Sequence, residues 1–345
     1  MEYIDDIRRE TDNHLLTAEQ VDLTSLHSIR TFATKWIDNA PPRRLDMIIL
    51  CANTMTPAGG NVQSTGEGVE LNWQTNYLAN FHLLSILSPA LRAQPPDRDV
   101  RVLFGTCSSY MGGDLLHITQ PAPTYTRSAK TSNSVSDSAS IPLHTAPTKF
   151  SPGNAYATSK LALTTFALAF QKHLSSFKRP DKMPTNTKVL LVDPGFSRTP
   201  GIRRWLSWGS LLGLLLYLVL YPVWWFVLKS PDMGAQSFLY AAMEEKFSKR
   251  DSEGGSLIKE CRVRNFLRKE VEDEDSQKKL WEYSERMVQE AEKRGAVERA
   301  RVKKEQGEKK EAEDAVKEMQ DYKEKIGKKD GGKKEGSRRS RKAGT

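Results

Sequence analysis

The sequence is poor in cysteine and histidine, the residues that build disulfide frameworks and most zinc sites. Its 345 residues include three cysteines, Cys51, Cys107 and Cys261, which lie far apart and form no CxxC motif. The six histidines are scattered, with no HExxH motif and no partner at the spacing of a metal ligand. These absences argue against a disulfide framework and against a metal enzyme, and they favour a reducing compartment.

Targeting signals and early glycines are also lacking. The first residues, MEYIDDIRRETDN, are acidic and polar and resemble neither a signal peptide nor a transit peptide. The last residues, SRRSRKAGT, contain no lipidation or retrieval motif. The first glycine is Gly59, so the part before it contains no glycine-rich loop of the kind that cradles a phosphate group.

Charge is distributed unevenly along the chain. Residues 1–200 have the composition of an ordinary folded domain, whereas residues 205–228 carry no charge. From about residue 259 almost every second residue is charged, and residues 328–342 contain eight basic side chains. This pattern predicts a charged region at 263–325, helical over 275–325 with i,i+4 ion pairs, and then a basic disordered tail at 326–345.

The first half alternates apolar runs with helical periods, which predicts an α/β fold with a parallel sheet. The expected strands are residues 15–21, 46–51, 100–106, 188–192 and 256–261. The expected helices are residues 24–38 (capped by Thr24), 68–93, 154–174 and 232–247. The run DMIILC at 46–51 is continuously apolar, as in a strand buried on both faces. Residues 112–153, rich in proline, serine and threonine, are interpreted as a partly disordered inserted loop.

The residues with the clearest chemistry are Tyr156 and Lys160. On a helix, positions i and i+4 share one face, so the phenol and the ammonium are neighbours. A cation about 4 Å from a phenolate stabilises it by roughly 4 kcal/mol at an effective dielectric constant near 20. That equals about three pKa units, enough to bring a tyrosine near neutrality, where it exchanges protons with an alcohol or ketone. The alternative is a chance pair on a solvated helix.

The context of this pair resembles the short-chain dehydrogenase/reductase family over about residues 3–261. The matching motifs, in family order, are Val21-Asp22-Leu23, Asp46-Met-Ile-Ile-Leu-Cys-Ala-Asn53, Asn76 in NWQTNYLANFHLL, Arg101-Val-Leu-Phe-Gly-Thr-Cys-Ser-Ser109, Asn154-Ala-Tyr156 through Lys160, and Asp193-Pro-Gly-Phe-Ser-Arg-Thr199. The resemblance implies an incomplete Rossmann-like parallel sheet with flanking helices. It also implies an oxidoreductase that uses NADP or NAD, between which this sequence does not distinguish.

Residue roles follow from that resemblance. It implies Asn76, Ser108, Tyr156 and Lys160 as catalytic residues. It implies contacts to the cofactor from Asp22, Asn53, Tyr156, Lys160, Pro194, Gly195 and Thr199. The run TCSS allows a one-residue slip, so Cys107 is the alternative to Ser108, although a thiol is the weaker hydrogen-bond donor. Cys51 stands where the family has a polar side chain, which removes or rearranges one contact.

One family feature has no counterpart in this sequence. Members begin with a strand and a TGxxxGIG loop that brings the backbone to the cofactor pyrophosphate. Their absence here is interpreted as a truncated sequence, with a cofactor-free remnant as the alternative. We therefore expect these 345 residues to bind NADPH weakly or not at all.

The apolar run at 205–228, WLSWGSLLGLLLYLVLYPVWWFVL, is long enough to span a bilayer and has tryptophans near its ends. A single pass would separate elements that should share one sheet, so the run is predicted to enter the membrane and return. Gly209, Gly213 and Pro222 offer places to bend. A buried core helix is the alternative.

These features divide the chain into a core at 1–203, a membrane-associating segment at 204–229, the end of the core at 230–262, the charged helix and the tail. They resemble a fungal branch of the family on lipid droplets, endoplasmic reticulum or vacuole, which implies a lipophilic substrate at the cytosolic face of a membrane. A homodimer is allowed, and no nucleic-acid partner is expected. The alternative function is a catalytically inactive remnant that acts as a membrane-surface scaffold.

Overall fold

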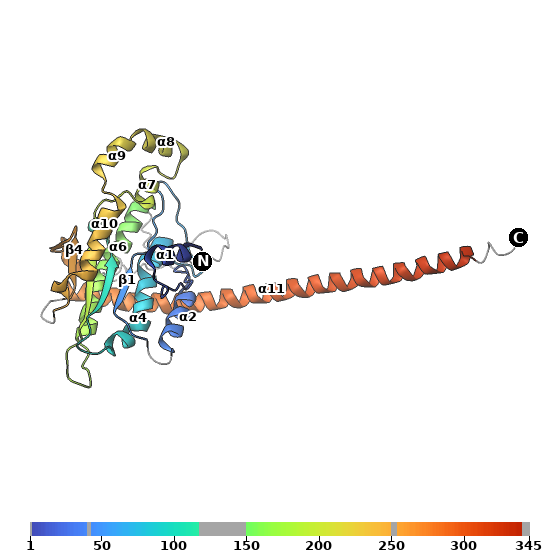
Figure 1. The fold of residues 1–345 in the computed structure, drawn as a ribbon, viewed down its shortest axis with the longest axis horizontal. Helices are drawn as coiled ribbons and strands as arrows, with labels where there is room; N and C mark the ends of the chain where they lie inside the picture. Colours follow the sequence, from blue (N-terminus) through green and yellow to red (C-terminus); the bar gives the residue numbers. More distant parts are fainter. Residues whose placement is uncertain (1, 40–42, 117–149, 250–253, 340–345) are drawn as a thin grey trace, which may run out of the picture. The chain divides into compact units, whose positions relative to one another are not determined.

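The computed structural model describes residues 2–39, 43–116, 150–249 and 254–339. Two compact units make up the chain, Met1–Glu292 and Lys293–Thr345. The first unit contains the sheet and is shown in Figure 1. The expected loop at 112–153 falls mostly on residues 117–149, which lie outside the described residues. Its first residue, Gly112, ends η2, a 3₁₀ helix over Ser108–Gly112, and its last two residues, Pro152 and Gly153, already belong to the following helix.

The sheet has five strands in the order β1-β2-β3-β4-β5. The strands β1 (Met47–Leu50), β2 (Val100–Gly105), β3 (Thr187–Asp193) and β4 (Ser256–Lys259) run parallel. A tight turn at Glu260 and Cys261, both with positive φ, then adds the short antiparallel β5 (Arg262–Arg264). The predicted α/β fold with a parallel sheet and flanking helices is confirmed, with β5 as an unforeseen addition.

The edge of the sheet at β1 differs from the expectation. Ile49 is 50% exposed, so β1 is not buried on both faces. Residues 15–21 form no strand, and the prediction of one there was wrong. A strand requires a hydrogen-bonded neighbour, whereas the carbonyl of Leu16 accepts its bond from the Arg8 side chain and Leu15 is 91% exposed.

Helices cover both faces of the sheet (Figure 1). Side chains on a strand alternate between the faces, and the core divides accordingly. Val102, Phe104 and Leu191 belong to the larger core with α4 (Ala79–Arg92), α6 (Pro152–Ser175) and the start of α11 (Glu274–Arg339). Leu103 and Leu190 belong to the smaller core with α10 (Pro231–Met243) and the 3₁₀ helix η3 (Glu245–Phe247).

The helix expected at 68–93 is present but not uniform. It consists of α3 (Leu71–Trp73), a π-helical turn η1 (Gln74–Leu78) and α4. Glu70 caps it by accepting from the backbone N–H of Trp73 (2.7 Å). π-turns inside α-helices occur often at functional sites.

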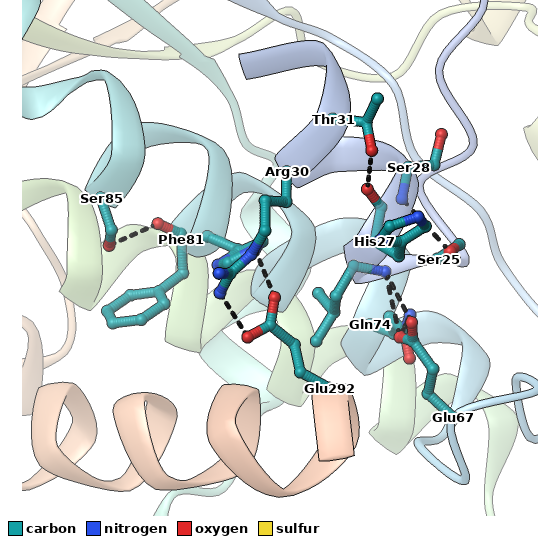
Figure 2. A network of polar contacts seen from close by, with 12 residues as sticks. Ser25, His27, Ser28, Arg30, Thr31, Glu67, Gln74, Phe81, Ser85 and Glu292 are labelled. Atoms are coloured by element: carbon teal, nitrogen blue, oxygen red, sulfur yellow. Dashed lines mark hydrogen bonds and ion pairs between the residues drawn. The ribbon is translucent and has the colours of Figure 1, made fainter. Parts of the chain in front are cut away.

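The helix expected to start at Thr24 starts one residue later. Ser25 caps α2 (Leu26–Ile37), and the buried Glu67 carboxylate accepts from the Leu26 N–H at 2.9 and 3.0 Å. Figure 2 shows Glu67 beside Gln74 and, further along α2, Arg30 reaching Glu292. These contacts fix α2 against η1 and α11. An amphipathic helix α1 (Glu2–Thr11) and a 3₁₀ turn η4 (Lys269–Val271) complete this unit.

The apolar run folds into short helices, α7 (Pro200–Leu206), α8 (Leu211–Val219) and α9 (Tyr221–Val227). Gly209, with φ +64°, separates α7 from α8, and Pro222 lies at the start of α9; Gly213 lies inside α8. Ser197 and Lys229 form a β-bridge, so the chain between them, here called the hairpin, leaves and returns at one point (Figure 1). The predicted return of the chain is confirmed, and its entry into a membrane stays a prediction. Among the residues that the structure describes, no helix combines the length and apolarity needed to cross a membrane.

The charged region is helical, as predicted. Within the first unit, residues of α11 up to Glu292 pack on the core through Leu280, Met287 and Ala291. In the second unit the helix carries exposed i,i+4 ion pairs such as Arg301–Glu305 (3.0 Å). The helix continues to Arg339, whereas a disordered tail was expected from residue 326.

Candidate active site

The candidate site lies at the edge of the sheet where β2 and β3 end. Parallel strands bring their carboxyl ends to the same edge, where α/β proteins bind ligands. Cys107 follows β2, Asp193 ends β3, and α6 brings Tyr156 and Lys160. Ser151 and Pro152 start α6, the former by accepting from the N–H of Asn154.

Tyr156 lies between a thiol and an ammonium group. The Cys107 Sγ is 3.5 Å from the Tyr156 hydroxyl and 2.8 Å from the Ser109 hydroxyl. The Lys160 Nζ is 5.7 Å from the centre of the Tyr156 ring and donates to the carbonyl of Gly105 (3.0 Å). The tyrosine and lysine are therefore close, as the spacing predicts.

The electrostatics of the pair differ from the expectation. Burial raises the pKa of Tyr156 above its usual value, and Cys107 and Asp193 add to this effect. Burial also lowers the pKa of Lys160. The predicted decrease in the Tyr156 pKa is not found, because burial removes both groups from water and this is the largest effect on each. Tyr156 is thus protonated at neutral pH.

Asn76 lies in the π-helical turn η1 and connects the site to the end of β1. Its Oδ1 accepts from the N–H of Thr54 (2.7 Å), and its Nδ2 donates to the carbonyl of Thr54 (2.9 Å). The same Nδ2 donates to the Ser159 hydroxyl (3.0 Å), which donates to the carbonyl of Tyr156 (2.7 Å). Asn76 therefore fixes the position of α6 relative to the segment after β1.

The Ser108 hydroxyl bonds to side chains of β3 and β4. It donates to Asp193 Oδ2 (2.6 Å) and accepts from Lys259 Nζ (2.6 Å). The structure therefore places Cys107, the alternative left open by the TCSS run, beside the Tyr156 hydroxyl. Ser108 remains a residue of the site through a different contact.

The residues expected to contact a cofactor lie in three places. Pro194, Gly195 and Thr199 follow β3; Gly195 has φ +75°, and the Thr199 hydroxyl caps α7. Asn53 is exposed after β1 and donates to the carbonyl of Cys51 (3.2 Å). Asp22 is exposed before α2 and accepts from the N–H of Thr24 (2.8 Å), so it ends no strand.

The donor set fits the nicotinamide half of a dinucleotide. Lys160 is buried and uses one of its ammonium donors on Gly105, which leaves donors for the hydroxyls of a ribose. In the part of the chain that the structure describes, no cluster of three or more histidine, cysteine, aspartate or glutamate side chains is arranged to hold a metal ion.

Comparison with known proteins gives the family. No family model matches the chain. The uncharacterized oxidoreductase pbr1 of Schizosaccharomyces pombe is 40% identical over 293 residues, which cover 85% of this chain and 72% of that protein. An uncharacterized oxidoreductase of Saccharomyces cerevisiae is 36% identical over 315 residues, covering 86% and 72%. Human retinol dehydrogenase 13 is 28% identical over 283 residues, covering 82% and 72%.

With this sheet, the Tyr156–Lys160 pair and these relatives, the chain belongs to the short-chain dehydrogenase/reductase family and is an oxidoreductase enzyme. Sequence reasoning missed two members of the site, Lys259 and the Asp193 side chain. Asp193 had a signal, since it ends a buried strand next to Pro194. Lys259 had none, because it looks like any other lysine of a charged region.

Proposed function

We propose that this enzyme transfers a hydride between a nicotinamide cofactor, NADP or NAD, and a lipophilic alcohol or carbonyl compound at a membrane surface. The observation that carries the proposal is the Tyr156 hydroxyl, 3.5 Å from the Cys107 thiol and on the same helix face as the buried Lys160. Two hydrogen-bonding groups so placed are able to contact one substrate oxygen.

The residues divide the work in carbonyl reduction. The hydride for the carbonyl carbon would come from a reduced nicotinamide held by Lys160 and the residues after β3. Tyr156 gives its proton to the carbonyl oxygen, and Cys107 donates a hydrogen bond to the same atom. Lys160 holds the ribose and stabilises the phenolate that remains after proton transfer. Asn76 keeps Tyr156 in place through Ser159 and the Thr54 backbone.

A pocket formed by α7, α8 and α9 is the evidence for a lipophilic substrate. It has a volume of about 290 Å³ and an aromatic and aliphatic lining. The lining residues are Ala58, Trp205, Leu206, Trp208, Leu216, Tyr217, Leu220 and Trp224. An apolar pocket of this kind takes a hydrocarbon chain or ring system, and one relative is named for retinol, a lipophilic alcohol.

The outer surface of the same hairpin supports membrane association. Leu211 is 87% exposed and Phe226 is 92% exposed, and most of their neighbours in α8 and α9 are also exposed. An exposed apolar surface of this kind marks an interaction site. Arg198, Arg203 and Arg204 precede it and no acidic residue lies between Asp193 and Asp232, which suits anionic lipid headgroups.

An activity assay tests the chemistry. Oxidation of NADPH or NADH by the 345-residue chain would be followed with retinal and with a long-chain aliphatic ketone, at cofactor concentrations high enough to offset the weak binding expected from the missing TGxxxGIG loop. Tyr156→Phe is expected to lose at least about 10²-fold in kcat, because the phenyl ring has no proton to give. Tyr3→Phe removes an exposed phenol of α1, which belongs to neither the site nor the apolar pocket, and serves as the matched control. Equal activity of Tyr156→Phe and the wild type would refute the proposed role.

Vesicle binding tests the location. Co-sedimentation with vesicles containing phosphatidylserine should decrease at least about tenfold in Leu211→Glu/Phe226→Glu, because two apolar side chains no longer enter the bilayer. Leu15→Glu changes an equally exposed leucine outside the hairpin and should bind like the wild type. Binding without activity in the first assay would instead favour the inactive scaffold.

A further inference from the structure

Asp193, Ser108 and Lys259 form a polar cluster in the site that has no role in the proposed chemistry. Asp193 is buried; its Oδ1 accepts from the N–H of Gly195 (2.9 Å) and its Oδ2 from the Ser108 hydroxyl (2.6 Å). Lys259 Nζ donates to the Ser108 hydroxyl (2.6 Å) and lies 3.6 Å from Asp193 Oδ2. Each of the three side chains therefore contacts the other two.

This cluster is connected to Tyr156 in two ways. Ser108 directly follows Cys107, whose thiol contacts the Tyr156 hydroxyl, so fixing Ser108 also fixes the backbone of Cys107. In addition, Asp193 is one of the groups, after burial and Cys107, that raise the pKa of Tyr156. The charged and titratable groups around this point are thus Asp193 from β3, Lys259 from β4, Cys107 from the start of η2, and Tyr156 and Lys160 from α6.

We propose that Lys259 is a positioning residue of the active site, which neutralises the buried Asp193 carboxylate and holds Ser108 so that the Cys107 thiol stays against the Tyr156 hydroxyl. Ser108 then connects the Asp193–Lys259 ion pair to the backbone of Cys107 and does not contact the substrate. This role deepens the proposed function, on which it rests, because it assigns the geometry of the proton donor to a lysine on another strand. Asp193 is buried, whereas the Lys259 side chain is 36% exposed, so removing Lys259 would leave the buried carboxylate without its cation.

A cofactor-free experiment reads the pairing directly. In protein labelled with [γ-¹³C]aspartate, the Asp193 signal is assigned by its loss in Asp193→Asn and followed from pH 3 to 8. In Lys259→Met the pH at which Asp193 takes up a proton should rise by about one unit or more, since the carboxylate loses its cation. Lys259→Arg should restore the wild-type midpoint. If Lys259→Met does not fold, as judged by circular dichroism, Lys259→Gln replaces it.

Lys229→Met is the matched control. Lys229 also pairs with a carboxylate, Glu260, at 2.6 Å and lies close to the same loop. Its loss should leave the Asp193 midpoint unchanged. An unchanged midpoint in Lys259→Met, or an equal shift in Lys229→Met, would overturn the proposal.

Steady-state kinetics of the Lys259 variants test whether Lys259 positions the proton donor. At pH 7, kcat of Lys259→Met should fall about tenfold with KM unchanged, and the pH profile of kcat should differ from that of the wild type because Asp193 has lost its cation. A wild type without activity would refute the proposed function and leave the Asp193 titration to decide this inference. An active Lys259→Met enzyme with the wild-type pH profile would refute the positioning role alone.

Discussion

Helix α6 and the α8–α9 hairpin are both rich in apolar residues, but they use them in opposite ways. Phe166 of α6 is fully buried, with its ring 5.1 Å from Phe81 and 5.6 Å from Trp281. Phe226 of α9 is 92% exposed, although the residues next to it in the sequence are as apolar as those next to Phe166. Hydrophobic content alone therefore does not indicate burial; the α6 surface has partners, and in the structure the hairpin surface has few.

The largest expected effect separates the two regions by stability. Phe166→Ala should reduce the free energy of unfolding by about 3–5 kcal/mol, because it leaves a cavity among packed aromatic rings. Phe226→Ala should change it by less than about 0.5 kcal/mol. Urea unfolding followed by circular dichroism measures both. Similar losses in the two variants would mean that Phe226 packs against the protein in solution.

Within the packed region, neighbouring residues should differ sharply in their effect on catalysis. Cys107→Ala should reduce kcat by about 10- to 100-fold, since it removes the donor beside the Tyr156 hydroxyl, whereas Cys107→Ser should retain activity. Ser108→Ala should lose less than about tenfold, because its hydroxyl bonds to Asp193 and Lys259. Steady-state kinetics with NADPH tests this order. A larger loss in Ser108→Ala would return the substrate contact to Ser108.

The loop that joins β3 to the hairpin should be moderately sensitive. Gly195 has φ +75°, and a Cβ at that position would lie 2.6 Å from Glu260 Oε1. Gly195→Ala is expected to cost about 1–2 kcal/mol of unfolding free energy through backbone strain. Gly153→Ala, where a Cβ meets nothing within 4 Å, is the control. Equal melting temperatures of the two variants would contradict the strain argument.

The smallest expected effect is a pH dependence in the packed region. Burial lowers the pKa of His82 in the folded protein, with Glu292 opposing and Arg30 adding to this decrease. A folded-state pKa below the unfolded value means that the unfolded chain binds the proton more readily. The contribution of neutral His82 to the free energy of unfolding is therefore fully present above about pH 6.5 and is lost as the pH falls below it.

Unfolding experiments at pH 7 and pH 5 measure this dependence. The wild type should lose about 1 kcal/mol more than His82→Leu over this interval, because leucine takes up no proton. His14→Leu changes an exposed histidine and should follow the wild type. An identical loss in His82→Leu and the wild type would show that His82 does not control the acid sensitivity.

Much of the fold could be predicted because local patterns were strong and unambiguous. The runs at 100–106 and 188–192 are apolar and short, and they form β2 and β3. The segment at 15–21, LLTAEQV, was also predicted to be a strand but forms none, because pairing is decided by a neighbour that no local pattern specifies. The edge position of β1 was not predictable for the same reason.

By itself the sequence determined the α/β class, the hairpin with its bends at Gly209 and Pro222, and the Tyr156–Lys160 pair, since each depends on residues close together in the chain. Only the tertiary structure decided that Cys107 and not Ser108 lies beside Tyr156, that Lys259 reaches Asp193, and that the pKa of Tyr156 is raised. Those outcomes depend on distance and burial between segments far apart in sequence, and electrostatic effects follow distance and burial more than residue type.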